Sequence, residues 1–499
     1  MKMYNYKRLH PFVILKRSTS WVFSFSLLIA FDVFRNIESK SSWFYSIAIL
    51  GSLFFLAFIF NLYRWFTFKY AITSTNLSIK SGIFFKREKT IPFSRIQSIH
   101  QKTWFLFRPF NLVSITIETA SSSSKIEDIV LEVVTRSTYN LLENLRLGKE
   151  NTIDSGKTQI YMPQYSVSLN NIIIFSLIDL DVISVILGLI TIVYPFSHFA
   201  YKYLNSFLSK LFTSGILILT FVLITVVTLT ILGTIIKNIF KYYKFTVYRE
   251  LNHIIIKRGF FTRTTLSIPI ERIQAIRINS SLLQMLLNIK TVELLLASGT
   301  TSEAKEDASD TNFFLFPIIN GHLLTKKLMQ ILPEFTNTKI IQKKPHTVSC
   351  PPHYFLSSRF RFLNLLLLVP LFFWSGNWYI LFSVIILFFT LLSFINSIWQ
   401  TKSQAVTYYE KELLMIRTVL FFTRTEYLCP LNKIQTISIS TTPFLYYQKL
   451  GHISFVFKTG ESASTIKLKY LSWKTCETIR FHCAPRIKNY TLIKKEVQP

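Results

Sequence analysis

A seven-residue motif that occurs three times constrains the fold of this chain more than any other feature. Its copies read Ile91-Pro92-x-x-Arg95-Ile96-Gln97, Ile268-Pro269-x-x-Arg272-Ile273-Gln274 and Cys429-Pro430-x-x-Lys433-Ile434-Gln435. A pair of strongly apolar segments precedes each copy. Because internal repeats fix the architecture before any local pattern is considered, the sequence predicts one unit written three times. That unit is a transmembrane helix hairpin followed by a basic, β-rich domain.

The residues around the motif repeat as well. Phe260-Phe261-Thr262-Arg263-Thr264 recurs letter for letter as Phe421-Phe422-Thr423-Arg424-Thr425. The first two copies keep one register without a gap, which aligns Gly82 with Gly259, Pro92 with Pro269 and Asn111 with Asn288. The third copy has Leu420 in place of the glycine. We expect it to need two extra residues before Leu450-Gly451, which would put Gly451 at the position of the two asparagines.

The composition is that of a membrane protein. Half of the 499 residues are hydrophobic, 47 are phenylalanine, and only 16% are charged, whereas about a quarter of the residues are charged in a typical soluble domain. The first apolar stretch begins near Trp21, has no small-residue cleavage site and continues into a second one, so no cleavable signal peptide is predicted. The net charge of +30 fits either anionic lipid headgroups as partners or simply a cytoplasmic location of the basic parts.

Six segments are apolar enough to be considered as membrane spans. They are Trp21–Phe34, Trp43–Tyr63, Val182–Phe199, Leu211–Ile236, Phe362–Trp374 and Trp378–Trp399. The second member of each pair has the length that a bilayer requires, whereas each first member is short or polar. The loops inside the pairs carry little charge, so the positive-inside rule places the N-terminus, the β-rich domains and the C-terminus in the cytosol. If the short fifth segment does not cross, the last domain lies outside.

Three carboxylates lie in or beside these segments. Asp32 lies near the outer end of its predicted span, and Asp179 and Asp181 lie at a predicted inner interface. Carboxylates at membrane depth are candidates for ion coupling. Because no acidic residue recurs in the third pair, a relay shared by all repeats is disfavoured.

The four cysteines give no metal site. They are Cys350, Cys429, Cys476 and Cys483, and no two are spaced as a CxxC pair. Cys476 and Cys483 flank His482 on a predicted helix, but a second pair of ligands is missing. We therefore predict free thiols in a reducing compartment, with no metal and no cofactor.

The domain after each helix pair is predicted to be a small β-structure. In the first copy, residues 70–73, 77–80, 89–92, 96–100, 113–119 and 129–134 show the alternation of half-buried strands. An amphipathic helix with Tyr139, Leu142 and Leu145 on one face then closes the unit. The later copies follow the same order and end in helices near His322–Leu332 and Trp473–Cys483. Short strands closed by one helix describe a small barrel or sandwich, in an α+β membrane protein.

These residues carry a resemblance to a known family. The sequence Tyr-x-Ile/Val-Thr leading to a glycine turn, followed by the Ile-Pro-x-x-Arg-Ile-Gln motif, resembles the bacterial pleckstrin-homology-like (PH-like) multipass membrane proteins of the three-domain type. The resemblance covers nearly the whole chain and implies three PH-like domains and a location in the bacterial cytoplasmic membrane. It implies no catalytic residue. The chain departs from the family pattern at Leu420, Cys429 and Lys433, which puts the geometry of the third turn in question.

The repeats and the apolar segments together give the expected domain organisation. Residues 1–63 hold the N-terminus and the first hairpin, 171–240 the second hairpin and 359–400 the third. The PH-like domains are expected at 64–150, 241–335 and 401–487, with linkers at 151–170 and 336–358 and a basic tail at 488–499.

The candidate lipid-contact residues lie at the turn after the second strand of each copy, where cations flank adjacent phenylalanines. They are Lys80, Lys86, Arg87, Lys89, Phe84 and Phe85; Lys257, Arg258, Arg263, Phe260 and Phe261; and Arg417, Arg424, Phe421 and Phe422. Such a turn can place aromatic rings at a membrane interface and cations among phosphates. The alternative is a paired strand end whose phenylalanines pack in the core.

The motif itself is a second candidate. Its most regular positions are Pro92, Arg95 and Gln97; Pro269, Arg272 and Gln274; and Pro430, Lys433 and Gln435. A cation beside an amide can bind a headgroup, but the same residues can end a strand and satisfy backbone groups. The structural interpretation is favoured, since duplication of one domain would preserve them in either case.

Three functions remain open at this point. The first is a non-enzymatic membrane protein whose cytosolic domains bind anionic phospholipids or partner proteins, in envelope maintenance or in protection against stress or antimicrobials. The second is a transporter or lipid-moving channel formed by six helices. The third is a scaffold that assembles with a smaller PH-like membrane protein. Hydrolase, Walker and dinucleotide motifs are absent from the sequence, and no aromatic-basic stripe indicates nucleic-acid binding.

Overall fold

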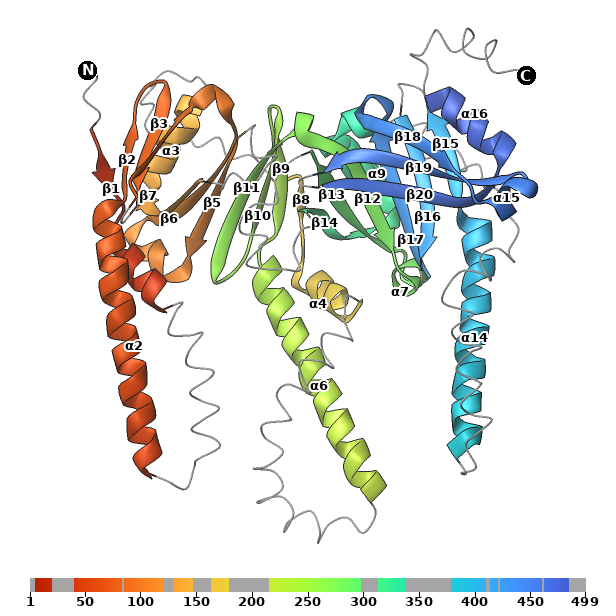
Figure 1. The fold of residues 1–499 in the computed structure, drawn as a ribbon, viewed down its shortest axis with the longest axis horizontal. Coiled ribbons are helices and arrows are strands. Elements are labelled where there is room, and N and C mark those ends of the chain that lie inside the picture. The colour runs from red at the N-terminus through yellow and green to blue at the C-terminus, as the bar shows by residue number, and fades with distance from the viewer. Residues whose placement is uncertain are drawn as a thin grey trace. The chain divides into compact units, whose positions relative to one another are not determined.

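The computed structural model describes residues 5–19, 40–82, 85–119, 129–146, 163–178, 215–297, 313–336, 378–409, 413–420, 422–459 and 462–483. These residues form four antiparallel sheets and several helices, which alternate with the strands along the chain (Figure 1). The chain divides into two compact units, Met1–Ile268 and Pro269–Pro499. The boundary falls inside the second copy of the repeat, directly before the last residue of its third strand.

The first unit contains two sheets, in the strand orders β1-β2-β3-β4 and β7-β6-β5-β11-β10-β9-β8. Its strands are β1 (Lys7–Arg8), β2 (Lys69–Ile72), β3 (Asn76–Ser81), β4 (Arg87–Pro92), β5 (Ile96–Trp104), β6 (Leu112–Thr119), β7 (Ile129–Thr135), β8 (Tyr165–Ser166), β9 (Thr246–Glu250), β10 (His253–Arg258) and β11 (Thr262–Pro269). Its helices are α2 (Lys40–Thr67), α3 (Arg136–Arg146), α4 (Leu169–Ile178) and α6 (Gly215–Tyr242), with the 3-10 helices η1 (Phe93–Arg95) and η2 (Phe105–Phe110).

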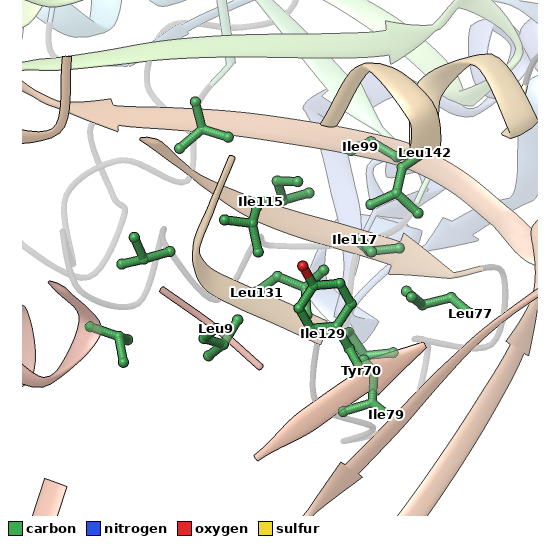
Figure 2. Close-up of a cluster of buried hydrophobic side chains, with 14 of the residues drawn as sticks. Leu9, Tyr70, Leu77, Ile79, Ile99, Ile115, Ile117, Ile129, Leu131 and Leu142 are labelled. Carbon is green, nitrogen blue, oxygen red and sulfur yellow. The ribbon is translucent and has the colours of Figure 1, made fainter. Parts of the chain in front are cut away.

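The core of the first copy lies between its two sets of strands. Leu77, Ile99, Ile115 and Ile117 are fully buried there, and α3 closes the cluster with Leu142. Figure 2 shows side chains of β3, β5, β6 and α3 gathered in this cluster. The strands agree with the alternation in the sequence, because successive side chains of a strand point to opposite faces of the sheet.

One expectation about β6 is wrong. The alternation predicted a buried face and an exposed polar face, but Ser114, Thr116 and Glu118 on the polar face are buried as well. Glu118 accepts a hydrogen bond from the Ser98 hydroxyl and lies 3.3 Å from the His100 imidazole. Polar groups of the neighbouring strand β5 thus satisfy Glu118 instead of water, as is usual for a buried polar group.

The second unit also contains two sheets, in the orders β14-β13-β12-β17-β16-β15 and β18-β19-β20. Its strands are β12 (Ile273–Ser280), β13 (Ile289–Leu296), β14 (Phe313–Asn320), β15 (Ala405–Tyr409), β16 (Leu413–Leu420), β17 (Thr423–Pro430), β18 (Ile434–Ser440), β19 (Leu450–Thr459) and β20 (Ser462–Ser472). Its helices are α7 (Leu282–Leu286), α9 (Gly321–Ile331), α14 (Trp378–Ser403), α15 (Pro443–Tyr447) and α16 (Trp473–Cys483), with η3 (Ile270–Arg272), η4 (Pro333–Phe335) and η5 (Leu431–Lys433). Phe455, Phe457 and Leu468 are fully buried in its core, together with free thiols at Cys429, Cys476 and Cys483.

Successive copies of the repeat share sheets. In the first unit β11 of the second copy pairs with β5 of the first, and Arg263 lies opposite Thr103. In the second unit β17 of the third copy pairs with β12 of the second, and Arg424 lies opposite Ser280. These two pairs occupy equivalent positions in the repeat, so both junctions use the same register.

The backbone corrects the predicted alignment of the third copy. Asn111, Asn288 and Lys449 all adopt left-handed conformations, with φ of 51°, 51° and 54°. Lys449 therefore occupies the position of the two asparagines, and no extra residues precede it. Gly451 lies two residues later, on β19, so its predicted alignment is wrong.

The glycine turn differs in the third copy, as the departure at Leu420 suggested. Gly82 and Gly259 have φ of 125° and 107°, and a Cβ atom at either would lie about 2 Å from a backbone oxygen. In the third copy the positive φ moves to Phe422, at 61°, and Leu420 lies opposite Thr423 in a tighter hairpin. A residue with a side chain at position 420 is tolerated because the turn is shorter there.

The predicted transmembrane hairpins are not supported. Within the described part of the chain, no helix combines the length and the apolar character that crossing a membrane requires. The first segments of the predicted pairs, Trp21–Phe34, Val182–Phe199 and Phe362–Trp374, lie outside the described residues. The second segments are the helices α2, α6 and α14, each of which leads directly into the first strand of a copy.

The C-terminal ends of two of these helices contact the β-rich units through aromatic residues. Trp65 of α2 donates its indole N–H to the backbone oxygen of Leu9 at 2.7 Å and packs against the first core. Trp399 of α14 makes an edge contact with Phe422. The ends of the helices are therefore structural parts of the β-rich units.

Candidate functional site

The repeated motif forms the connection between the two sets of strands in each copy. Its proline ends one strand, and the three residues that follow form a 3-10 helix, η1, η3 or η5. Pro92, Pro269 and Pro430 have φ of −68°, −63° and −67°, which is the value that the proline ring imposes. The proline ring therefore restricts the backbone at this connection to the φ value of the folded state even in the unfolded chain.

Two polar side chains of the motif, those of Gln274 and Lys433, bind backbone oxygens. Arg272 is buried, and the Gln274 amide donates to the Arg272 backbone oxygen at 3.4 Å. The Lys433 ammonium donates to the Glu271 backbone oxygen at 2.9 Å. The backbone oxygen of Gln97 accepts from Arg146 at 3.1 Å, whereas Gln435 is exposed. Arg95 is exposed as well. These contacts give the motif a structural task, and headgroup binding by it stays a prediction.

The turn of the first copy presents its cations to solvent. Phe85 is 84% exposed, and Lys86 and Arg87 beside it are exposed. Lys80 is paired with Glu88 at 3.3 Å and lies over the Tyr6 ring, and Lys89 is half-buried. Phe84 lies outside the described residues. Among the described residues of this turn, Phe85, Lys86, Arg87 and Glu88 are therefore exposed.

The turn of the second copy packs on the end of α6. Phe260 and Phe261 lie 5.6 and 4.6 Å from the Phe240 ring of α6, and Phe261 lies 5.7 Å from Phe105 of η2. Both turn phenylalanines stay about 40% exposed. The two phenylalanines are therefore neither buried in the core nor fully exposed. They belong to a partly exposed aromatic cluster with Phe240 and Phe105.

The cations of the second turn lie in different surroundings. Lys257 lies 5.0 Å from the centre of the Tyr248 ring and Arg258 lies over the Tyr242 ring. Arg263 is exposed on the strand after the turn. Lys257 and Arg263 line a cavity described below, whereas Arg258 does not.

The turn of the third copy is neutralised. Arg417 forms a two-point ion pair with Glu426, at 2.7 and 2.8 Å. Arg424 is half-buried, and burial together with the nearby Arg417 lowers its pKa. Phe422 packs against α14, and Phe421 lies outside the described residues. The three turns are therefore not equivalent, and contact of any of them with lipid stays a prediction.

The sequence did not predict a second exposed apolar feature, the helical tip that precedes each left-handed residue. The tips are η2, α7 and α15. Their exposed apolar residues are Phe105, Leu106 and Phe110; Leu282, Leu283, Leu286 and Leu287; and Phe444, Tyr446 and Tyr447. The sequence did contain a signal for these tips. Each is a run of large apolar residues without alternation, between two strands whose residues alternate between apolar and polar.

A cavity of about 510 Å³ lies in the first unit, between α3 and the sheet that the first two copies share. From α3 it is lined by Arg136, Tyr139, Glu143 and Arg146, which occupy one face of the helix by their spacing. From the strands it is lined by alternate residues, which therefore share one face of the sheet: Gln101 and Thr103; Arg263, Thr265 and Ser267; His253, Ile255 and Lys257; and Tyr248 and Glu250. The cavity needs strands from both copies.

The lining is rich in cations. Arg108, Arg136, Arg146, Lys257 and Arg263 face two carboxylates, Glu143 and Glu250. Arg146 pairs with Glu143 at 2.5 Å and lies 3.1 Å from the His253 ring. Burial, followed by the charge of Glu143, raises the pKa of Tyr139. The cavity therefore carries an excess of positive charge beside a neutral tyrosine hydroxyl.

Asp32, Asp179 and Asp181 lie outside the described residues. Their predicted role at membrane depth stays a prediction.

Comparison with known proteins agrees with the repeat. The Bacterial PH domain family model matches residues 24–145, 169–312 and 362–487. The chain is similar to the UPF0699 transmembrane protein YdbT of Bacillus subtilis (strain 168). The two are 24% identical over 486 residues, which is 92% of this chain and 93% of the relative. No solved structure matches the chain.

The three family matches contain all three copies of the proline motif and together cover more than half of the chain. Its repeated unit is therefore the bacterial PH domain, and the protein belongs to the Bacterial PH domain family.

Proposed function

We propose that this protein is a non-enzymatic, membrane-associated protein whose PH domains bind anionic phospholipid surfaces. Its place would be the bacterial cytoplasmic membrane and its task envelope maintenance or protection against stress or antimicrobials. The relative's description as a transmembrane protein supports a membrane location. The observation that carries the proposal is the first turn, where the 84% exposed Phe85 stands beside the exposed cations Lys86 and Arg87.

The chemistry of this turn suits an interface between water and lipid. A phenylalanine gains free energy when it leaves water for the headgroup region. Each cation near an anionic surface contributes roughly 1 kcal/mol. Because these residues lie at the end of a hairpin, they can reach a surface without any change in the sheet. The exposed apolar tips η2, α7 and α15 offer further contact of the same kind.

A thermal stability assay with the full-length protein tests the proposal. The protein is held in dodecyl maltoside micelles mixed with either phosphatidylglycerol or phosphatidylcholine. We expect phosphatidylglycerol to raise the melting temperature, since a ligand that binds the folded state stabilises it. Salt should weaken the effect, because the Debye length is only about 8 Å at physiological ionic strength.

Charge reversal at the turn provides the decisive variant. In Lys86→Glu, Arg87→Glu, Lys89→Glu, most of the phosphatidylglycerol effect should disappear. The matched control carries the same change of charge at exposed sites of the third copy, Lys467→Glu, Lys469→Glu, Lys474→Glu, and should keep the effect. If the turn variant responds to phosphatidylglycerol as the parent does, the turn does not make the lipid contact. If phosphatidylglycerol does not stabilise the parent either, a partner protein, such as a smaller PH-like membrane protein, becomes the better candidate ligand.

A channel of six helices would need three membrane hairpins, and no helix among the described residues has the length and the apolar character of a membrane span.

A further inference from the structure

The cavity between α3 and the shared sheet of the first unit has the size and the polar lining of a small-molecule site. Its volume of about 510 Å³ lies in the range of ligand pockets. Two of its lining residues, Arg146 and Glu143, each have a buried side-chain atom, Nε and Oε2, without a hydrogen-bond partner among the described residues. The Arg146 side chain is only 7% exposed. Buried polar atoms without partners are costly, so a ligand with both an acceptor and a donor would stabilise this site.

The carboxylates that line the cavity do not pair with all of its cations. Arg136 and Arg263 form no ion pair with any other described residue, and Lys257 contacts a tyrosine ring instead of a carboxylate. Arginine side chains that converge on one space are typical of phosphate recognition, because the guanidinium group matches two phosphate oxygens at once. Glu143, Glu250 and Tyr139 add acceptors for hydroxyl groups at the same cavity.

At one position of the cavity lining, the second unit has a carboxylate where the first unit has a threonine. Strands β11 and β17 begin with Thr-Arg-Thr-Thr and Thr-Arg-Thr-Glu, so Thr265 corresponds to Glu426. The two residues also occupy equivalent registers, opposite Gln101 and Ile278. Glu426 is buried and pairs with both Arg417 and Lys290. Glu426 thus pairs with two cations of the second unit, whereas the equivalent position of the first unit holds the uncharged Thr265.

We propose that this cavity binds a phosphorylated polyol. The phosphate would lie beside Thr265, among Arg136, Arg263 and Lys257, and the hydroxyl groups would bind Glu143 and Glu250. This site is separate from the turn contact proposed above, because Lys86, Arg87 and Lys89 do not line the cavity. The ligand can be a free sugar or glycerol phosphate, or the headgroup of a phosphoglycerol lipid, since both present the same groups.

Isothermal titration calorimetry of the full-length protein in dodecyl maltoside tests the proposal, with glycerol 3-phosphate as the probe. Glycerol 3-phosphate should bind more tightly than inorganic phosphate, and glycerol alone should give no signal. The variant Thr265→Glu copies the second unit and should weaken binding at least about tenfold, because it supplies the anion from the chain. Thr265→Gln has nearly the same size without the charge and should stay within about twofold of the parent.

Further controls separate the site from general electrostatics. Lys467→Gln, Lys469→Gln removes two exposed charges outside the cavity and should leave the affinity for glycerol 3-phosphate unchanged. Arg136→Gln, Arg263→Gln removes two charges inside it and should abolish binding. Far-ultraviolet circular dichroism shows whether each variant is folded, and Thr265→Glu, at a partly exposed site, keeps the test valid if the double variant is not.

The same variants distinguish the two sources of the ligand. If Thr265→Glu lowers both the affinity for glycerol 3-phosphate and the stabilisation by phosphatidylglycerol, the ligand is a lipid headgroup. If it lowers only the affinity for glycerol 3-phosphate, the ligand is a free phosphate ester. The proposal is overturned if the parent binds neither probe, or if Thr265→Glu and Thr265→Gln bind equally well. The turn variant of the preceding section reports on the lipid surface independently, so failure of one proposal leaves the other standing.

Discussion

Arg263 on β11 lies directly opposite Thr103 on β5, in the antiparallel pair that joins the second copy of the repeat to the first. The pair belongs to a seven-stranded sheet that neither copy forms alone. The edge of β5 is therefore covered by a neighbouring copy, which protects it from pairing with other molecules. It also places side chains of both copies around one cavity.

We predict that breaking this junction destabilises the first unit. Thr264 lies opposite Lys102 in the middle of the paired segment, and Thr264→Pro removes a backbone donor from an inner strand. We expect the free energy of unfolding to fall by about 1–3 kcal/mol, the cost of an unsatisfied buried group. Urea denaturation measures the change. Lys86→Pro, in an exposed turn outside the strands, is the control and should be nearly neutral.

A second prediction concerns the glycine turn. Gly259 has φ of 107°, and a Cβ atom would lie 2.0 Å from the Thr262 backbone oxygen. Gly259→Ala should therefore lower the urea midpoint, with a cost of about 1–3 kcal/mol for the strained backbone. Gly233 on α6 has no atom within 4 Å of an added Cβ. Gly233→Ala should leave the midpoint unchanged or raise it, since alanine favours the helix. Equal effects at the two sites would contradict the assigned geometry.

The third prediction concerns the carboxylate that neutralises the second unit. Glu426 is buried between Arg417 and Lys290, so Glu426→Gln leaves two cations without a partner. Removing one member of a buried pair costs about 3–5 kcal/mol, and thermal denaturation of the second unit should show a loss of that order. Glu88 pairs with Lys80 at the surface, where ion pairs contribute little. Glu88→Gln should give no measurable change.

The fourth prediction concerns the thiols of the last helix. Burial raises the pKa of Cys476 and Cys483 from 9.0 to about 11. Because the thiolate is the reactive form, both should react slowly with iodoacetamide at pH 8 in a Cys350→Ser chain, and rapidly once the chain is unfolded in urea. The raised pKa stabilises the fold below pH 9, and this contribution is lost as the pH rises to about 11. Fast reaction of the folded chain at pH 8 would show that the helix does not cover these thiols.

The sequence predicted the local elements well, because alternation and turn residues are local signals. Strands β2 to β7 and the helices α3 and α16 lie where the pattern placed them. The pattern carried no information about which strand pairs with which, so the junction between β5 and β11 was not predicted. The cavity was missed for the same reason, since its cations lie on four elements from two copies and Arg136 and Arg263 are far apart in the chain.

Two predictions were wrong because they rested on residue type alone, without the backbone conformation. Gly451 was aligned with Asn111 because glycine is the usual residue at a left-handed position, but Lys449 adopts that conformation. The apolar segments were paired into hairpins from hydrophobicity alone. The C-terminal ends of α2 and α14 owe part of their aromatic content to packing on the sheets.

The identical register of the two junctions has a consequence for how the number of copies can change. Strand β17 begins with the same three residues as β11, and Ser280 stands where Thr103 does. A gene that lost or gained one whole copy, with the cut at equivalent positions, would bring together strands that already match. A chain with fewer or more copies could therefore pair its strands in the register that both present junctions use.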